Sequence, residues 1–226
     1  MQADDSIEQQ IVRSWTDNAD AWTHVVRAGL IPSRGAGTDA AIVRACAAIG
    51  RGPMLDVGCG EGWLVRELAA RGIEAHGIDV SEALVAQASA RSGSFSVATY
   101  AQIEADDRCA AGPWQAIVCN FALLGDPLHP LLAALRARLA PGGTLLVQTV
   151  HPWTARGDAP YRGEWRTERF EAFGTAFPSP MPWYYRPLAS WHEQFALAGL
   201  RVSGVDEPVH PHTGTPLSLL FRCEAA

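Results

Sequence analysis

Three closely spaced glycines follow the first strongly apolar strand of the sequence, and they constrain the fold more than any other feature. Residues 55–62 read Leu-Asp-Val-Gly-Cys-Gly-Glu-Gly, and a helical pattern begins directly after Gly62. Glycines let a backbone turn tightly and approach a ligand closely, and the start of a helix leaves N–H groups without partners. The segment therefore predicts a strand, a ligand-binding turn and a helix in immediate succession.

Short apolar runs alternate with helical segments in the residues that follow Pro53. The expected strands span 54–58, 74–79, 94–99, 115–119 and 143–150, and the expected helices between them span about 62–71, 82–91 and 128–139. Alternation of this kind favours a parallel sheet that helices cover on both faces. We therefore expect an α/β fold of the Rossmann-like, doubly wound kind.

Both flanks of this alternation have a different character. Apolar residues at spacings of three and four predict one amphipathic helix over 7–28, and a second helix is expected from a Thr38 cap to Ile49. Residues 151–187 are rich in proline, glycine and aromatics and lack helical periodicity. A helix at about 188–198 and two strands near 200–207 and 217–223 are expected to follow, with the strands paired antiparallel.

We interpret the chain as a single domain with four parts. These are an N-terminal helical cap (1–50), a ligand-binding core (51–150), an aromatic-rich insertion (151–187) and a C-terminal helix with a strand pair (188–226). Of 19 aromatic residues, 11 lie between 151 and 195. A long insertion without regular periodicity is uncommon unless it is functional, so it is either a lid over a site or a small satellite core.

Composition excludes several classes of protein. The chain is 48% hydrophobic and 19% charged, which is typical of a globular protein, and no apolar run approaches the ~20 residues of a membrane span. The first residues lack the apolar segment of a secretory signal. Five cysteines without a CxxC pair argue against a disulfide framework or a zinc site and favour reduced thiols in the cytoplasm.

Charge adds two further exclusions. The formal net charge is −6, which disfavours binding along a nucleic-acid backbone. All 18 basic residues are arginine, so neither a Schiff-base lysine nor a phosphate-binding P-loop lysine is present.

The spacing around the glycines distinguishes between nucleotide ligands. A dinucleotide loop normally reads GxGxxG and places a pyrophosphate at the helix start, whereas this loop reads GxGxG. Asp56 stands two residues before the first glycine, where it would repel a pyrophosphate but suit a ligand with an ammonium group. Asp79 ends the next expected strand, where a carboxylate can accept hydrogen bonds from ribose hydroxyls. The pattern favours S-adenosylmethionine (SAM) over NAD.

These residues together resemble class I SAM-dependent methyltransferases, of the bacterial type that acts on small molecules. Leu55–Gly62 is similar to the first motif of that family and Asp79 to its ribose-binding acid. Trp114–Leu124 resembles the fourth-strand motif, and Leu135–Val147 contains the family's Pro-Gly-Gly turn. The resemblance implies a seven-stranded, mostly parallel sheet whose last strand is antiparallel, and an enzyme that produces S-adenosylhomocysteine.

The same resemblance implies a set of cofactor contacts. Asp56 would hold the amino group of SAM, Gly58 and Gly60 would line its methionine part, and Cys59 lies between them. Asp79 would bind the ribose and Val80 would pack on the adenine, while Asn120 and Phe121 would flank the sulfonium. Many family members carry an acid after the third strand that binds the adenine amine. This chain has Ala101 and Gln102 there, so either the Gln102 side chain or the Ala101 amide is expected to replace it.

Candidates for the methyl-transfer step lie after the fifth expected strand. His151 ends that strand and is either a general base or a histidine that bonds the insertion backbone. Trp153, Trp183 and Tyr184 are candidates for an aromatic pocket that takes a small, flat acceptor. Arginines interleaved with them could hold an acidic group of the acceptor or form solvated strand faces. No residue set predicts a metal site, and the oligomeric state is not encoded in any motif.

Other functions are compatible with parts of this pattern. A nucleic-acid methyltransferase would share the fold, but Asn120-Phe121-Ala122-Leu123 lacks the Pro-Pro-aromatic signature of base-amino methylation. A non-catalytic SAM-binding regulator would share the cofactor loop. An NAD(P)-dependent oxidoreductase is disfavoured by the glycine spacing and by Asp56.

Overall fold

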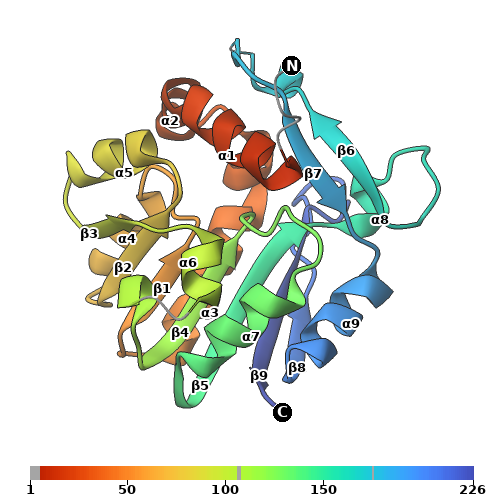
Figure 1. Ribbon diagram of the computed structural model, residues 1–226. Helices are drawn as coiled ribbons and strands as arrows, with labels where there is room; N and C mark the ends of the chain where they lie inside the picture. Colours follow the sequence, from red (N-terminus) through yellow and green to blue (C-terminus); the bar gives the residue numbers. More distant parts are fainter. Residues whose placement is uncertain (1–5, 106–107, 175) are drawn as a thin grey trace.

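A seven-stranded sheet forms the centre of the protein (Figure 1). The computed structural model describes residues 6–105, 108–174 and 176–226. The strand order is β3-β2-β1-β4-β5-β9-β8. The strands are β1 (Met54–Val57), β2 (Ala75–Asp79), β3 (Ser94–Val97), β4 (Trp114–Asn120), β5 (Leu139–Val150), β8 (Leu200–Asp206) and β9 (Ser218–Ala225).

Strand directions agree with the expected topology. Strands β1 to β5 pair in parallel, and β9 lies antiparallel between β5 and β8. The α/β class, the mostly parallel sheet and the antiparallel last strand are therefore confirmed. All parallel strands end at the same edge, which lies uppermost in Figure 1.

Helices cover both faces of the sheet. They are α1 (Ile7–Asp17), α2 (Ala19–Arg27), α3 (Asp39–Ile49), α4 (Trp63–Ala69), α5 (Glu82–Ser89), α6 (Tyr100–Glu104), α7 (His129–Ala137), α8 (Pro152–Ala155) and α9 (Leu188–Leu197). Short helical turns lie at Arg34–Thr38, Arg108–Ala110 and Glu171–Phe173. None of the helices in the described ranges has the length and hydrophobicity that a membrane crossing needs.

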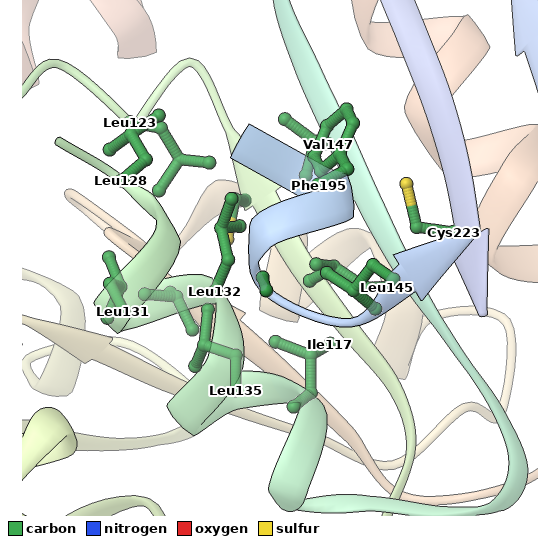
Figure 2. Close-up of a cluster of buried hydrophobic side chains, with 14 of the residues drawn as sticks. Ile117, Leu123, Leu128, Leu131, Leu132, Leu135, Leu145, Val147, Phe195 and Cys223 are labelled. Carbon is green, nitrogen blue, oxygen red and sulfur yellow. The ribbon is translucent and has the colours of Figure 1, made fainter. Parts of the chain in front are cut away.

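Successive strand residues are buried on opposite faces, as the period of a strand requires. On β1, Leu55 and Val57 belong to one apolar cluster, whereas Met54 belongs to another. The first cluster packs β4 and β5 against α7 and α9, and Figure 2 shows Leu132 and Phe195 facing Val147 and Leu145 there. The second cluster joins the opposite face to α3 and α4. Burial on both faces explains why these strands read as continuous apolar runs.

The N-terminal segment departs from the single helix predicted over 7–28. The helix is broken at Asn18, which separates α1 from α2. Asn18 is fully buried, and its side-chain amide donates to the Ser179 carbonyl at 2.7 Å while its oxygen accepts from the Ser179 N–H at 3.1 Å. These hydrogen bonds to a residue 161 positions away fix the break. The spacing of apolar residues in the sequence does not indicate such a break.

Two other local expectations differ from the structure. Thr38 precedes α3 without capping it, because its hydroxyl donates instead to the Ser33 carbonyl at 3.2 Å. The insertion also contains regular structure. Strands β6 (Glu164–Glu168) and β7 (Met181–Tyr185) pair antiparallel as a separate two-stranded sheet.

The β6–β7 pair and the N-terminal helices lie together above the carboxyl edge of the large sheet (Figure 1). Helix α1 packs against β7, and α1 and α2 both contact α5. The apolar stripe that predicted the N-terminal helix therefore faces the sheet edge, where Ile7, Ile11, Trp15 and Trp22 line a cavity.

Candidate functional site

Two adjoining cavities open at the carboxyl edge of the parallel strands. One has a volume of about 370 Å³ and lies over the ends of β1 and β2, under α1. The other has a volume of about 270 Å³ and extends toward the β6–β7 pair. Both cavities are lined by Trp15, Trp22, Gly58, Gly60, Asn120, Phe121 and Leu124. We call them the first and the second cavity.

The glycine loop forms the floor that the cavities share. The N–H groups of Gly58 and Cys59 donate to the Ile78 carbonyl of β2 at 2.8 and 3.0 Å. Gly58 and Gly60 have φ angles of +74° and +57°, a conformation that side chains other than glycine rarely adopt. A Cβ atom on Gly60 would lie 3.4 Å from Nε1 of Trp22, so the loop and α2 approach each other at this point.

Asp79 braces this loop from the end of β2. Its carboxylate accepts hydrogen bonds from the Gly60 N–H at 2.8 Å and the Ser81 N–H at 2.9 Å. Burial raises the pKa of Asp79, and the backbone N–H donors oppose that rise. Asp79 also lines the first cavity, so its carboxylate can accept further hydrogen bonds from a ligand there.

Asp56 is a buried carboxylate at the end of β1. Its side chain is 2% exposed and lines the second cavity. Burial, followed by the negative charge of Asp79, raises the pKa of Asp56 to about 7, and no hydrogen bond within the described residues opposes the rise. A buried carboxylate without a partner is costly, and a cationic ligand would remove that cost.

The end of β4 lines both cavities. Phe121 has a φ angle of +55° and donates its backbone N–H to the Gln148 carbonyl of β5 at 2.8 Å. The Asn120 side-chain oxygen accepts from the Gln148 amide at 2.8 Å. Strained backbone of this kind clusters at ligand sites.

The predicted cofactor residues are unevenly distributed around these cavities. Val80 lines the first cavity and Cys59 the second. Ala101 and Gln102 are exposed and lie outside the residues that line either cavity. The Gln102 side-chain oxygen instead accepts from the Thr99 N–H at 2.9 Å and completes a capping box at the start of α6.

Sequence reasoning missed several lining residues of the first cavity. Thr99, Tyr100 and Glu104 flank the predicted positions, and Glu8 joins them from α1. The pKa of Glu104 is raised by desolvation and by the nearby charge of Glu8. The capping-box spacing of Thr99 and Gln102 was the signal that could have identified the Gln102 side chain as occupied.

Two of the three aromatic pocket candidates lie at the second cavity. Trp183 and Tyr184 line it from β7, together with Phe170 and Phe173. Trp153 is 60% exposed and does not belong to the lining residues. Its ring instead packs against the Arg156 guanidinium, 4.1 Å from the ring centre.

His151 follows β5, next to the lining residues Thr149 and Val150. Its Nε2 lies 2.9 Å from Oε1 of Glu207, and the ring is largely buried. Nδ1 has no hydrogen-bond partner within the described ranges. The ring does not line either cavity, so a role as a general base stays a prediction.

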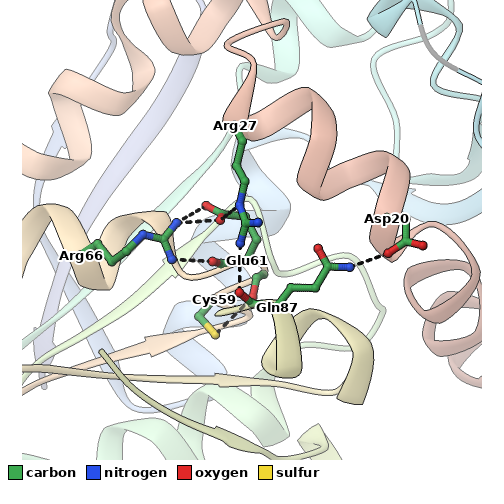
Figure 3. Close-up of polar contacts among 7 residues, drawn as sticks. Asp20, Arg27, Cys59, Glu61, Arg66 and Gln87 are labelled. Carbon is green, nitrogen blue, oxygen red and sulfur yellow. Dashed lines mark hydrogen bonds and ion pairs between the residues drawn. The ribbon is translucent and has the colours of Figure 1, made fainter. Parts of the chain in front are cut away.

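A buried ion-pair cluster ties α2 to the glycine loop (Figure 3). Glu61, 1% exposed, accepts from Arg66 of α4 at 2.6 Å and from Nε of Arg27 of α2 at 2.8 Å. Arg27 also donates to the Gln87 carbonyl at 2.9 Å, and the Gln87 side chain donates to Asp20 at 2.6 Å. These contacts hold Trp22 over Gly60.

The described residues contain no group of three or more histidine, cysteine or acidic side chains arranged to hold a metal ion. All five cysteines are free, and burial raises the pKa of the Cys46 thiol to about 12.

Two solved structures that share the fold are methyltransferases. The CcbJ methyltransferase from Streptomyces caelestis superposes with a TM-score of 0.62 at 20% identity, covering 84% of this chain and 89% of that one. The magnesium protoporphyrin IX methyltransferase from Synechocystis, solved with bound SAM, has a TM-score of 0.66 at 15% identity and covers 100% of both chains. Identities this low establish the fold alone.

Sequence comparison finds bacterial relatives and a family. The ubiquinone biosynthesis O-methyltransferase of Methylococcus capsulatus is 37% identical over 102 residues, which make up 43% of this chain and 43% of that protein. The protein of the same name from Xanthomonas campestris is 34% identical over 103 residues, again 43% of each. The chain thus spans less than half of the curated relatives it matches. A family model described as a methyltransferase domain matches residues 38–203, and the chain therefore belongs to the methyltransferase-domain family.

Proposed function

We propose that this protein transfers a methyl group from SAM to a small, flat organic acceptor. The observation that carries the proposal is Asp56, a carboxylate that is buried without a hydrogen-bond partner among the described residues and lines the second cavity beside the glycine loop. A ligand that carries an ammonium group supplies the missing charge. A pyrophosphate would bring negative charge to the same place.

The residues present fit SAM. The first cavity would take the adenosine, with the ribose hydroxyls at Asp79 and the base near Val80, Thr99 and Tyr100. The methionine part would follow the backbone of Gly58 and Gly60 toward Asp56. Glu104 and Glu8 line the same cavity and are candidates for the adenine amine, a role that sequence assigned to Ala101 or Gln102.

When bound, SAM supplies an electrophilic methyl group on a sulfonium. The work of the chain is then to orient the acceptor and to exclude water, and alignment alone is worth up to ~7–11 kcal/mol in well-oriented systems. Trp15 and Trp22 cover the shared floor from α1 and α2, while Trp183 and Tyr184 form part of the far wall. Flat aromatic walls favour a flat acceptor.

Calorimetric titration with S-adenosylhomocysteine, with NADH as the comparison, tests this proposal. Micromolar affinity for the homocysteine product and none for NADH is the expected result. Preference for NADH, or no affinity for the product, would overturn the proposal. Tight binding of the product without turnover of any phenol, amine or nucleic-acid acceptor would instead identify a regulator.

The Arg27→Ala substitution is expected to speed the dissociation of S-adenosylhomocysteine about tenfold. The change removes the bond to Glu61 and the bond to the Gln87 carbonyl, and hydrogen bonds of charged groups are worth about 1.5–3 kcal/mol each. Stopped-flow fluorescence measures the rate. Arg71→Ala, which breaks an exposed pair with Glu67, is the matched control. Equal dissociation rates in the two variants would show that α2 does not retain the ligand.

His151→Ala is expected to lower turnover by about 100-fold or more if the ring is the general base, with little change in affinity for S-adenosylhomocysteine. Glu168→Gln is the informative companion, since Glu168 is a carboxylate that lines the second cavity. The pH profile of kcat decides between them. A general base makes kcat fall at low pH, where the base is protonated. If that fall persists in His151→Ala and disappears in Glu168→Gln, the base is Glu168.

A further inference from the structure

Five arginines lie among the aromatic residues of the insertion, and one of them, Arg186, has a fully buried side chain. Arg156 packs on the Trp153 ring. Arg162 has a side chain that is 74% exposed, Arg169 is exposed, and Arg166 is bound to Glu164 and to the Ala155 carbonyl. The Arg186 side chain is 0% exposed. Arg186 follows β7 and is a lining residue of the second cavity.

Only part of the Arg186 guanidinium is bonded within the described residues. Nη2 donates to Oδ1 of Asp126 at 2.7 Å and to the Gly125 carbonyl at 2.9 Å. Nε and Nη1 are buried and have no hydrogen-bond partner there. A guanidinium carries five N–H donors and keeps its charge in proteins, so the donors on these two nitrogens need acceptor oxygens.

Aromatic rings enclose the same group. The guanidinium carbon lies 5.0 Å from the ring centres of Tyr184 and Trp191, and both rings line the second cavity. Because Nε and Nη1 are buried, a ligand reaches them only after a neighbouring group shifts. Tyr184 is half-buried on β7, whereas Trp191 is buried in α9, so Tyr184 has more freedom to move.

The charges around Arg186 determine whether a carbonyl oxygen or a carboxylate of the acceptor binds there more favourably. Asp126 already neutralises Arg186, and Glu168 and Asp56 also line the second cavity. An acceptor with a carboxylate would add a further negative charge beside them. A carbonyl oxygen satisfies the N–H donors without that repulsion.

We propose that Arg186 is a specificity-determining residue, which binds a carbonyl oxygen on a flat, neutral acceptor through Nε and Nη1. The inference rests on the proposed function and adds the class of acceptor, a hydroxyaryl ketone or a similar conjugated carbonyl compound. The aromatic walls hold the ring of the acceptor, and Arg186 fixes its orientation by one polar end.

Calorimetry on protein saturated with S-adenosylhomocysteine tests the inference with three matched phenols. They are 4-hydroxyacetophenone, 4-ethylphenol, which lacks the carbonyl, and 4-hydroxybenzoate, which carries a charge. The ketone is expected to bind at least about tenfold more tightly than 4-ethylphenol, a difference of about 1.4 kcal/mol. It is also expected to bind more tightly than the benzoate.

Two variants connect the preference to Arg186. Arg186→Met is expected to bind the ketone and 4-ethylphenol equally while keeping its affinity for S-adenosylhomocysteine. Arg186→Lys keeps the charge beside Asp126 but loses the Nε and Nη1 donors, so it is expected to lose the preference with a smaller loss of thermal stability than Arg186→Met. If Arg186→Met does not fold, the preference for the ketone over 4-ethylphenol in Arg186→Lys tests the role of Arg186.

Several outcomes would overturn the inference. These are no binding of the ketone up to 5 mM, on the order of the weakest affinity calorimetry detects, equal binding of the ketone and 4-ethylphenol in the wild type, or a preference that survives in Arg186→Lys. Tightest binding of the benzoate would make Arg186 an anion site instead. If the proposed function itself is wrong, the protein will not bind S-adenosylhomocysteine in the first titration, before any phenol is added.

Discussion

Gly60→Val is expected to weaken the binding of S-adenosylhomocysteine by more than about 100-fold, a loss of about 2.7 kcal/mol or more. Gly60 has a φ angle of +57°, and a branched side chain is strained in that conformation. The new methyl groups would also occupy the space between the loop and Trp22, since the Cβ alone would lie 3.4 Å from the indole nitrogen. Calorimetry measures the affinity directly.

Gly72→Val is the matched control for this change. Gly72 has a φ angle of +73°, but a Cβ atom there would meet nothing within 4 Å. The two variants therefore share the backbone strain, and only one of them fills the cavity. Similar losses of thermal stability with a loss of affinity confined to Gly60→Val are expected. Wild-type affinity in Gly60→Val would contradict the assignment of the loop as the floor of the ligand site.

Asp56→Asn is expected to lower the affinity for S-adenosylhomocysteine by about 10- to 100-fold and to stabilise the protein without ligand. The affinity falls because the amide cannot form the charged hydrogen bond to an ammonium group. Stability rises because the carboxylate is 2% exposed and its ionisation in the folded state is opposed by burial and by Asp79. Calorimetry and thermal unfolding at pH 8 measure the two effects.

The raised pKa of Asp56 also makes the stability of the protein and its affinity for the ligand depend on pH. The pKa of Asp56 is about 7 in the folded protein against an ordinary value of 3.8, so the unfolded chain releases the proton first as pH rises. The contribution of this group to the free energy of unfolding is therefore complete below about pH 4 and is lost as pH rises to about 7. Ligand affinity should move the opposite way and tighten between pH 6 and 8. In Asp56→Asn the change of affinity with pH should be absent and the loss of stability should be smaller, because Asp79 also has a raised pKa. A pH-dependent affinity that persists in this variant would assign the dependence to another group.

The parts of the fold that local patterns determine were predicted well from the sequence. Strand β1, the glycine loop and α4 follow each other without a gap, and burial on both faces makes β1 and β4 continuous apolar runs. Asp56 and Asp79 were located at the ends of their strands for the same reason. Each of these features depends on residues that are close together in the chain.

The parts that depend on distant contacts were not predicted. The break at Asn18 is fixed by Ser179, and the pairing of Glu164 with Tyr185 joins residues in a segment without clear periodicity. Gln102 and Arg186 illustrate the same limit at the site. Whether a polar side chain is occupied by a cap, exposed to water or buried beside a cavity is decided by tertiary packing, which a list of residue types does not contain.

The placement of tryptophan gives the protein a built-in optical signal. Of its eight tryptophans, six line the two cavities, namely Trp15, Trp22, Trp63, Trp165, Trp183 and Trp191. Trp15 and Trp22 lie 5.2 Å apart in an edge-to-face arrangement at the shared floor. Intrinsic emission is therefore dominated by residues that a bound molecule would touch. Unlabelled protein can report occupancy of either cavity by its own fluorescence, which suits it to screening large collections of unmodified acceptors.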